Sequence, residues 1–234
     1  MIVNPLAQPY SIVVIGASWG GLHALSVLVG GLPRHFSVPL VLVQHRSRDA
    51  HSLLGDLLQD HTALPVLEIE DKQPIAPGQI YLAPADYHLL IEENHFALTV
   101  DEPVRFSRPS IDVTFSSAAD SFGPRAVGVT LTGANEDGAA GLRRIVERGG
   151  RAVVQDPATA EVRTMPAAAI RAVPSADVVP LEGIAAHLAA LMERSSAAIN
   201  FPLPHHATRD AGTRQQEAGT RRAGEPRPEH RPRS

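Results

Sequence analysis

Five short apolar runs, each followed by a stretch with the periodicity of a helix, limit most strongly what this chain can fold into. The runs are residues 11–15 (SIVVI), 39–43 (PLVLV), 126–132 (AVGVTLT), 151–155 (RAVVQ) and 177–180 (DVVP). A strand that is apolar at successive positions is buried on both faces, which is typical of parallel sheets covered by helices. The pattern predicts an α/β fold, a doubly wound and mainly parallel sheet with helices on both faces.

The expected helices have apolar residues that recur every three or four positions. The first carries Leu22, Leu25, Leu28 and Val29 on one face, and the others cover about residues 49–59, 111–121, 137–148, 165–172 and 181–192. The segments 79–84 (QIYLAP) and 88–100 (HLLIEENHFALTV) have the pattern of short antiparallel strands, with a turn at Glu93 and Asn94. We therefore expect an antiparallel hairpin insertion.

Residues 1–194 are predicted to form one domain, and residues 195–234 a disordered tail rich in Arg and Pro. From His205 onward the chain has no Val, Leu, Ile or Phe, so it cannot bury enough apolar surface to offset the entropy of ordering. The net charge of the chain is −4, and a surplus of three positive charges in this tail leaves about −7 for the first 204 residues. Such an acidic folded part argues against a nucleic-acid partner.

The residue types that are missing exclude several classes of protein. The chain has no Cys, which excludes disulfides, thiolate nucleophiles and Cys-based metal sites. Its first residues, MIVNPLAQPYS, lack the pattern of a signal peptide, and no segment approaches the ~18 apolar residues of a membrane span. We expect a soluble cytoplasmic protein that needs neither a metal nor a cofactor and does not insert into a membrane.

The first apolar run ends in a glycine-rich turn, residues 16–21 (GASWGG), which suggests two kinds of site. A dinucleotide site needs G-x-G-x-x-G and an acidic residue at the end of the second strand. Here Ser18 replaces the second glycine, and the second strand ends in Gln44 and His45. A P-loop would require G-K-[ST], which is absent. The phosphate-binding interpretation therefore fails.

A nucleophile is the other interpretation, because residues 16–20 (GASWG) satisfy G-x-S-x-G, which presents a serine at a sharp strand-to-helix turn. A structural glycine turn is the alternative. A candidate general base supports the nucleophile: His45 follows the next apolar strand. Because the carboxyl ends of parallel strands share one edge of the sheet, His45 is expected to lie near Ser18. The turn after the strand at 126–132 offers Glu136 and Asp137 as the third member. Asp137 could instead only favour the start of its own helix.

The residues that carry these features resemble the catalytic domain of CheB-type protein-glutamate methylesterases. VVIGASWGGLHAL is similar to that family's G-A-S-[TA]-G-G signature, VLVQH to its strand ending in Gln-His, and RPSIDVTFSSAA to its R-P-S-[VI]-D segment. VGVTLTGANEDGAAG is similar to its L-T-G-x-x-x-D-G-A-x-G loop. The resemblance extends from about residue 11 to residue 191, with the motifs in order.

The resemblance implies that Ser18 is the nucleophile, His45 the general base and Asp137 the carboxylate that orients the base. It implies hydrolysis of glutamate γ-methyl esters in the cytoplasmic domain of methyl-accepting chemoreceptors, with deamidation of receptor glutamines in some members. Backbone amides near Trp19 and Ala134 are the candidates for the oxyanion hole. The segment 108–112 is expected to be structural, with Ser110 and Asp112 at the start of a helix.

Two departures from the family leave alternatives open. Trp19 stands where the family commonly has Thr, which favours a catalytically weak docking module for a receptor or a methyltransferase; a general carboxylesterase is a third possibility. The best-known members also carry an N-terminal receiver domain, and only ten residues precede the first strand here. We expect a stand-alone catalytic domain that is either constitutively available or governed by a separate partner, such as a methyltransferase of the same pathway.

Overall fold

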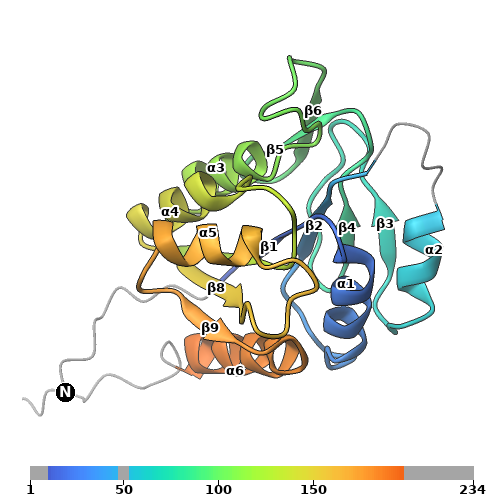
Figure 1. Ribbon diagram of the computed structural model, residues 1–234. Helices are drawn as coiled ribbons and strands as arrows, with labels where there is room; N and C mark the ends of the chain where they lie inside the picture. Colours follow the sequence, from blue (N-terminus) through green and yellow to red (C-terminus); the bar gives the residue numbers. More distant parts are fainter. Residues whose placement is uncertain (1–9, 47–52, 198–234) are drawn as a thin grey trace, which may run out of the picture. The chain divides into compact units, whose positions relative to one another are not determined.

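The main element of the fold is a seven-stranded parallel sheet (Figure 1). The computed structural model describes residues 10–46 and 53–197. The strands are β1 (Ile12–Ala17), β2 (Leu40–Gln44), β3 (Val66–Glu68), β4 (Ile80–Leu82), β7 (Ala126–Thr130), β8 (Arg151–Gln155) and β9 (Asp177–Val179). Their order is β3-β4-β2-β1-β7-β8-β9, and every neighbouring pair is parallel. The predicted doubly wound sheet is confirmed.

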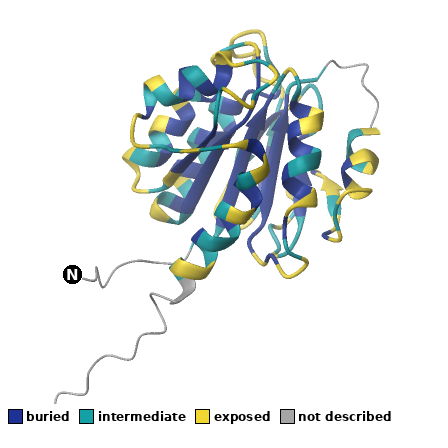
Figure 2. Cartoon of the chain, turned by 60° about the horizontal axis from the view of Figure 1, so that its bottom comes forward, coloured by how far each residue is buried: buried dark blue, intermediate teal, exposed yellow. Residues whose placement is uncertain are grey.

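Helices cover both faces of the sheet. Residues of α1 (Gly21–Gly30), α2 (Leu53–Gln59) and α6 (Ile184–Ala197) share one core cluster with Val13 and Ile15 of β1. Residues of α3 (Ile111–Phe122), α4 (Ala139–Glu147) and α5 (Thr164–Ala172) share the other with Ile12 and Val14. Successive residues of one strand therefore pack on opposite faces, and Figure 2 shows the buried strands between helices whose outer surfaces are exposed. Two short 3₁₀ helices, η1 (Gly123–Arg125) and η2 (Leu181–Gly183), connect these elements.

The hairpin insertion is confirmed, but its extent was predicted wrongly. Strands β5 (His88–Ile91) and β6 (Phe96–Thr99) form a separate antiparallel pair. The segment 79–84 does not join them, since β4 pairs in parallel with both β2 and β3. All three residues of β4 are buried, which is the signature of an internal parallel strand. Strand β3 was not predicted, because it has three residues and none of them is buried.

Several predicted boundaries shift by a few residues. The helix expected over 49–59 is described from Leu53 onward, and its predicted start lies outside the described residues. Helix α6 extends to Ala197, and the predicted tail beyond it also lies outside them. Helix α4 begins at Ala139, so Asp137 precedes this helix. Within the described ranges, no helix is long and apolar enough to cross a membrane.

Candidate active site

Ser18 and His45 lie side by side at the carboxyl edge of the sheet. Ala17, the last residue of β1, is in register with Gln44, the last residue of β2, so the next residue along each chain is Ser18 or His45. The His45 N–H donates to the Ala17 carbonyl over 3.1 Å, which continues the strand pairing to this point. Strand β1 lies between β2 and β7, where the strand order changes direction, which is the usual place for a site in such sheets.

The side chain of Gln44 ties the two strand ends together. Its Nε2 donates to the Ser18 carbonyl oxygen over 2.8 Å and to the His45 carbonyl oxygen over 3.0 Å. Gln44 is buried, and Gly21 lies against it so closely that any side chain at position 21 would collide with the amide. Of the Gln-His pair at the end of β2, His45 is thus the candidate base, and Gln44 is a clamp that fixes the main chain of Ser18 relative to that of His45.

His45 is hydrogen-bonded to Asp137. The His45 Nε2 lies 2.8 Å from Asp137 Oδ2, and the Asp137 side chain is fully buried. An ionised carboxylate can only accept, so in neutral His45 the proton lies on Nε2. The lone pair of Nδ1 is then left as the basic atom, and it can receive a proton from a neighbouring hydroxyl.

Asp137 is held by the N-terminus of α3, although Ile111, the first residue of that helix, lies 26 positions earlier in the sequence. Its two oxygens accept hydrogen bonds from the backbone N–H of Ile111 over 2.7 Å and of Asp112 over 3.0 Å, and from Ser110 Oγ over 2.9 Å. The sequence suggested that Asp137 could face the helix that follows it. The helix dipole that it complements is instead that of α3, and α4 begins two residues later.

These contacts keep Asp137 charged. Burial by itself raises the pKa of Asp137, but the hydrogen bonds from His45 and from the N–H groups of Ile111 and Asp112 outweigh it and hold the pKa below its ordinary value. For the neighbouring Asp112, burial dominates and raises the pKa, although the N–H of Gly141 binds its carboxylate over 2.7 Å. Asp137 is therefore the one of these two carboxylates that is suited to orient a histidine.

Sequence reasoning missed the contribution of Ser110 and His88 to this arrangement. Ser110 was expected to be structural, and it does cap α3 by accepting from the Val113 N–H, but its hydroxyl also binds Asp137. Behind it, buried His88 accepts the Ser110 N–H at Nδ1 over 3.2 Å and donates from Nε2 to the Glu102 carbonyl over 3.1 Å. His88 comes from β5, and only the pairing of the hairpin with α3 brings it here.

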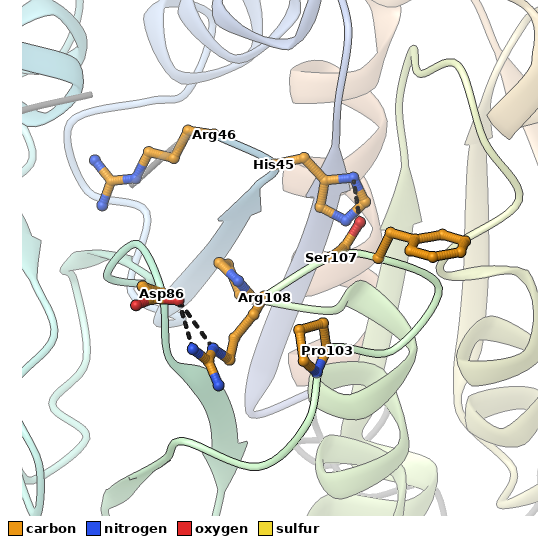
Figure 3. A pocket seen from close by; sticks show the side chains of 8 residues that line it. His45, Arg46, Asp86, Pro103, Ser107 and Arg108 are labelled. Carbon is orange, nitrogen blue, oxygen red and sulfur yellow. Dashed lines mark hydrogen bonds and ion pairs between the residues drawn. The ribbon is translucent and has the colours of Figure 1, made fainter. Parts of the chain in front are cut away.

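The hydroxyl of Ser18 makes no hydrogen bond to His45, or to any other group in the part of the chain that the structure describes. The Ser107 hydroxyl instead lies 3.5 Å from the basic atom, His45 Nδ1 (Figure 3). Hydrogen bonds of catalytic groups are often long before substrate binds, so the separation is compatible with a nucleophile and its base. The structure brings together two members of the predicted triad and places the third on the adjacent strand end.

Two backbone N–H groups near Ser18 are candidates for the oxyanion hole. Those of Trp19 and Ala134 have no acceptor in the described ranges 10–46 and 53–197. The loop that contains Ala134 touches Ser18, since a Cβ built on Gly133 would lie 2.9 Å from the Ser18 Cβ. Thr132, at the start of this loop, donates from Oγ1 to the Trp19 carbonyl over 3.0 Å and so fixes the two segments together.

Replacing Ser110 with alanine tests whether this serine acts beyond its cap. A lost N-cap costs about 1 kcal/mol of stability, and a lost hydrogen bond to a charged group about 1.5–3 kcal/mol. We expect a lower melting temperature, a fall in kcat of about tenfold and a shifted acid limb of the pH–rate profile. Ser117→Ala is the control, because the Ser117 hydroxyl donates to the Thr114 carbonyl within α3 and accepts from the Ile91 N–H of β5 but does not bind Asp137. Equal kcat values in the two variants would show that Ser110 acts only as the N-cap of α3.

A serine at a strand-to-helix turn, with a histidine bound to a buried aspartate on the same sheet edge, defines a serine hydrolase built on an open parallel α/β sheet. The chain order Ser, His, Asp differs from the Ser, Asp, His order of α/β-hydrolases. Another family of hydrolases is therefore indicated.

Comparison with known proteins identifies that family. The family model described as CheB methylesterase matches residues 13–188, and the chain belongs to this family. A Leptospira interrogans protein, named as a candidate protein-glutamate methylesterase/protein-glutamine glutaminase, is 45% identical over 154 residues, which are 65% of this chain and 80% of that one. The protein-glutamate methylesterase FrzG of Myxococcus xanthus is 42% identical over 181 residues, 77% of this chain and 54% of its own. The chain thus spans about half of FrzG.

A solved structure agrees with the fold. The crystal structure of the Thermotoga maritima CheB methylesterase catalytic domain superposes with a TM-score of 0.75 at 32% sequence identity. The superposition covers 79% of this chain and 98% of that one. The part of the chain described above therefore corresponds to a complete catalytic domain of the family.

Proposed function

We propose that this chain is a serine esterase that hydrolyses γ-methyl esters of glutamate in a protein substrate, with Ser18 as nucleophile, His45 as general base and Asp137 as the carboxylate that orients it. The observation that carries the proposal is the 2.8 Å contact between His45 and fully buried Asp137, on a strand end next to that of Ser18. A buried, hydrogen-bonded carboxylate that stays ionised is suited to stabilise a histidine when it becomes charged during the reaction.

The proposed reaction has two steps. The Ser18 Oγ attacks the ester carbonyl while His45 Nδ1 takes its proton, and the N–H groups of Trp19 and Ala134 stabilise the oxyanion. His45 then returns the proton to the departing methoxide, which leaves as methanol. Water, deprotonated by the same nitrogen, hydrolyses the acyl-enzyme to give the glutamate carboxylate and free Ser18.

The substrate class follows from family membership. Relatives are named protein-glutamate methylesterase/protein-glutamine glutaminase, which supports chemoreceptor glutamates as the esters and receptor glutamines as a second substrate. The primary amide would be attacked by the same serine, with ammonia as the leaving group. We place the substrate in the cytoplasmic domain of a methylated chemoreceptor, and a methyltransferase of the same pathway is the proposed regulatory partner.

Methanol release from a methyl-esterified chemoreceptor cytoplasmic fragment tests this proposal. The fragment should release methanol in proportion to enzyme, and its receptor glutamines should release ammonia. Binding of the fragment without release of either product would favour a docking module. Turnover of small soluble esters with none of the fragment would favour a general carboxylesterase.

A further inference from the structure

The shortness of the glutamate side chain dictates how a protein substrate must approach Ser18. Three carbon–carbon bonds of about 1.5 Å separate the main chain from the ester carbonyl, so the substrate's backbone passes within roughly 4 Å of the carbon under attack. The residues next to the methylated glutamate must therefore lie on the surface that surrounds Ser18 and His45. Side chains on this rim can distinguish one protein from another.

Two aromatic side chains stand exposed on this rim. Trp19, the chain's single tryptophan, follows Ser18 and is 67% exposed, and Phe106 precedes Ser107 and is fully exposed. Phe36, Phe96, Phe115 and Phe122 are all buried, so exposure is not the rule for phenylalanine in the described chain. Exposed aromatics are typical anchors of protein interfaces, because they bury a large area with few rotatable bonds.

Each aromatic lines the hollow that contains one of the two reacting side chains. Phe106 borders a cavity of about 420 Å³ with His45, Ser107 and Arg108, as Figure 3 shows for the labelled members. Trp19 borders a second hollow with Ser18, and this one continues along apolar side chains of α1 and α2, including Leu22 and Leu57. The two hollows lie at neighbouring strand ends, since Ser18 and His45 follow paired residues.

Phe106 is held in a conformation that a phenylalanine rarely adopts. Val104 and Ser107 exchange backbone hydrogen bonds of 3.2 and 2.9 Å, which leaves Arg105 and Phe106 as the two central residues of a tight turn. Both are left-handed, with φ of 50° and 64°, in a type of turn that favours asparagine and glycine. A strained and exposed aromatic beside a reactive histidine is therefore better explained by contact with a ligand than by folding.

Trp19 is also fixed in place. Its indole Nε1 donates to Glu161 Oε1 over 3.0 Å, across the opening of the turn that bears Ser18. The residue after it, Gly20, has a φ of 77°, and a Cβ there would lie 2.8 Å from the Glu161 Cβ. The ring is thus positioned by a hydrogen bond at one edge while most of its surface faces outward.

We propose that Trp19 and Phe106 form a docking surface for the substrate protein, contacting apolar residues next to the methylated glutamate on either side of the ester. This inference rests on the proposed esterase function and names the surface that selects a protein over a small ester. Small esters need only Ser18, His45 and the backbone oxyanion donors, so they do not depend on the two aromatic rings.

Phe106→Asn separates this role from a structural one. Asparagine suits the left-handed conformation, so we expect an unchanged or higher melting temperature together with a fall in kcat/KM for the methylated fragment of about tenfold. Hydrolysis of p-nitrophenyl acetate should change less than about twofold, because the reacting groups are intact. Phe106→Tyr should retain activity on the fragment. Trp19→Thr should also lower kcat/KM for the fragment, and Val178→Ala, at an exposed position on the distant edge strand β9, is the control.

The outcomes separate this inference from the proposed function. Loss on the fragment but not on the small ester supports the docking surface. Equal loss on both substrates would show that the aromatic side chains act in the chemical step. No loss on either substrate would show that they act neither in docking nor in chemistry. Both results overturn the docking inference and leave the proposed esterase function standing. If the unmodified chain releases no methanol from the fragment, the proposed function fails, and the docking inference fails with it.

Discussion

Ser18→Ala should abolish methanol release from a methylated receptor fragment, with kcat lowered by about 10⁴-fold or more. Alanine removes the only atom that can form the acyl-enzyme in the proposed route, while the oxyanion donors and the His45–Asp137 pair remain. The fold should be unaffected, because the Ser18 hydroxyl makes no hydrogen bond within the described residues, and Gln44 binds the carbonyl oxygen that alanine retains. Methanol measured in single-turnover and steady-state experiments checks the result.

The control for Ser18→Ala is Ser107→Ala, because the Ser107 hydroxyl lies 3.5 Å from His45 Nδ1 in the structure. If Ser18 is the nucleophile, activity is retained in Ser107→Ala and lost in Ser18→Ala. The opposite pattern would make Ser107 the nucleophile. A trapped acyl-enzyme located on residue 18 by mass spectrometry would give the same answer by a second route.

Asp137→Asn should lower kcat by about 10⁴-fold, the loss found when the wrong histidine tautomer is imposed in Ser–His–Asp enzymes. An asparagine that turns its N–H toward His45 Nε2 moves the imidazole proton to Nδ1, and the basic lone pair is lost. Glu136→Gln is the matched control, because Glu136 is exposed and pairs with Arg171 on the surface. A variant that keeps normal kcat would show that Asp137 serves the fold alone.

The same substitution should lower stability in a pH-dependent way. The pKa of Asp137 is lowered in the folded state, so its ionised form stabilises the fold above the unfolded pKa of about 3.9, and this contribution is lost as pH falls through the folded value. We expect Asp137→Asn to lower the free energy of unfolding by about 2–4 kcal/mol near pH 7, because the donors that bind the buried carboxylate lose their charged acceptor. The difference in unfolding free energy between the two proteins should shrink below about pH 4.

The fold was largely predictable because buried parallel strands leave a strong mark in sequence. Runs such as SIVVI and PLVLV have no polar residue facing solvent, and their spacing leaves room for one helix each. The segment at β4 has the same apolar pattern, but its position directly before the hairpin led to its prediction as an antiparallel strand. Strand β3 left no mark, since its three residues lie at the edge of the sheet and stay partly or fully exposed.

The predicted site residues followed from strand ends, whereas their supporting contacts did not. Ser18, His45 and Asp137 each follow an apolar run, so topology alone brings them to one edge. The carboxylate of Asp137 is bound by Ser110 and by backbone groups of α3, and His88 supports Ser110 from the hairpin. Those contacts depend on how α3 and β5 pack together, which no local pattern encodes.

The clamp formed by Gln44 has a consequence for the time scale of activation. Because one amide holds the carbonyls of Ser18 and His45, the main chains of the two residues cannot separate or approach without breaking it. The Ser18 side chain can still turn about its Cα–Cβ bond while this clamp holds, and rotations of side chains outside the core take nanoseconds or less. Each encounter with an ester therefore finds the main chain of the catalytic edge already in place, and only the Ser18 side chain has to adjust.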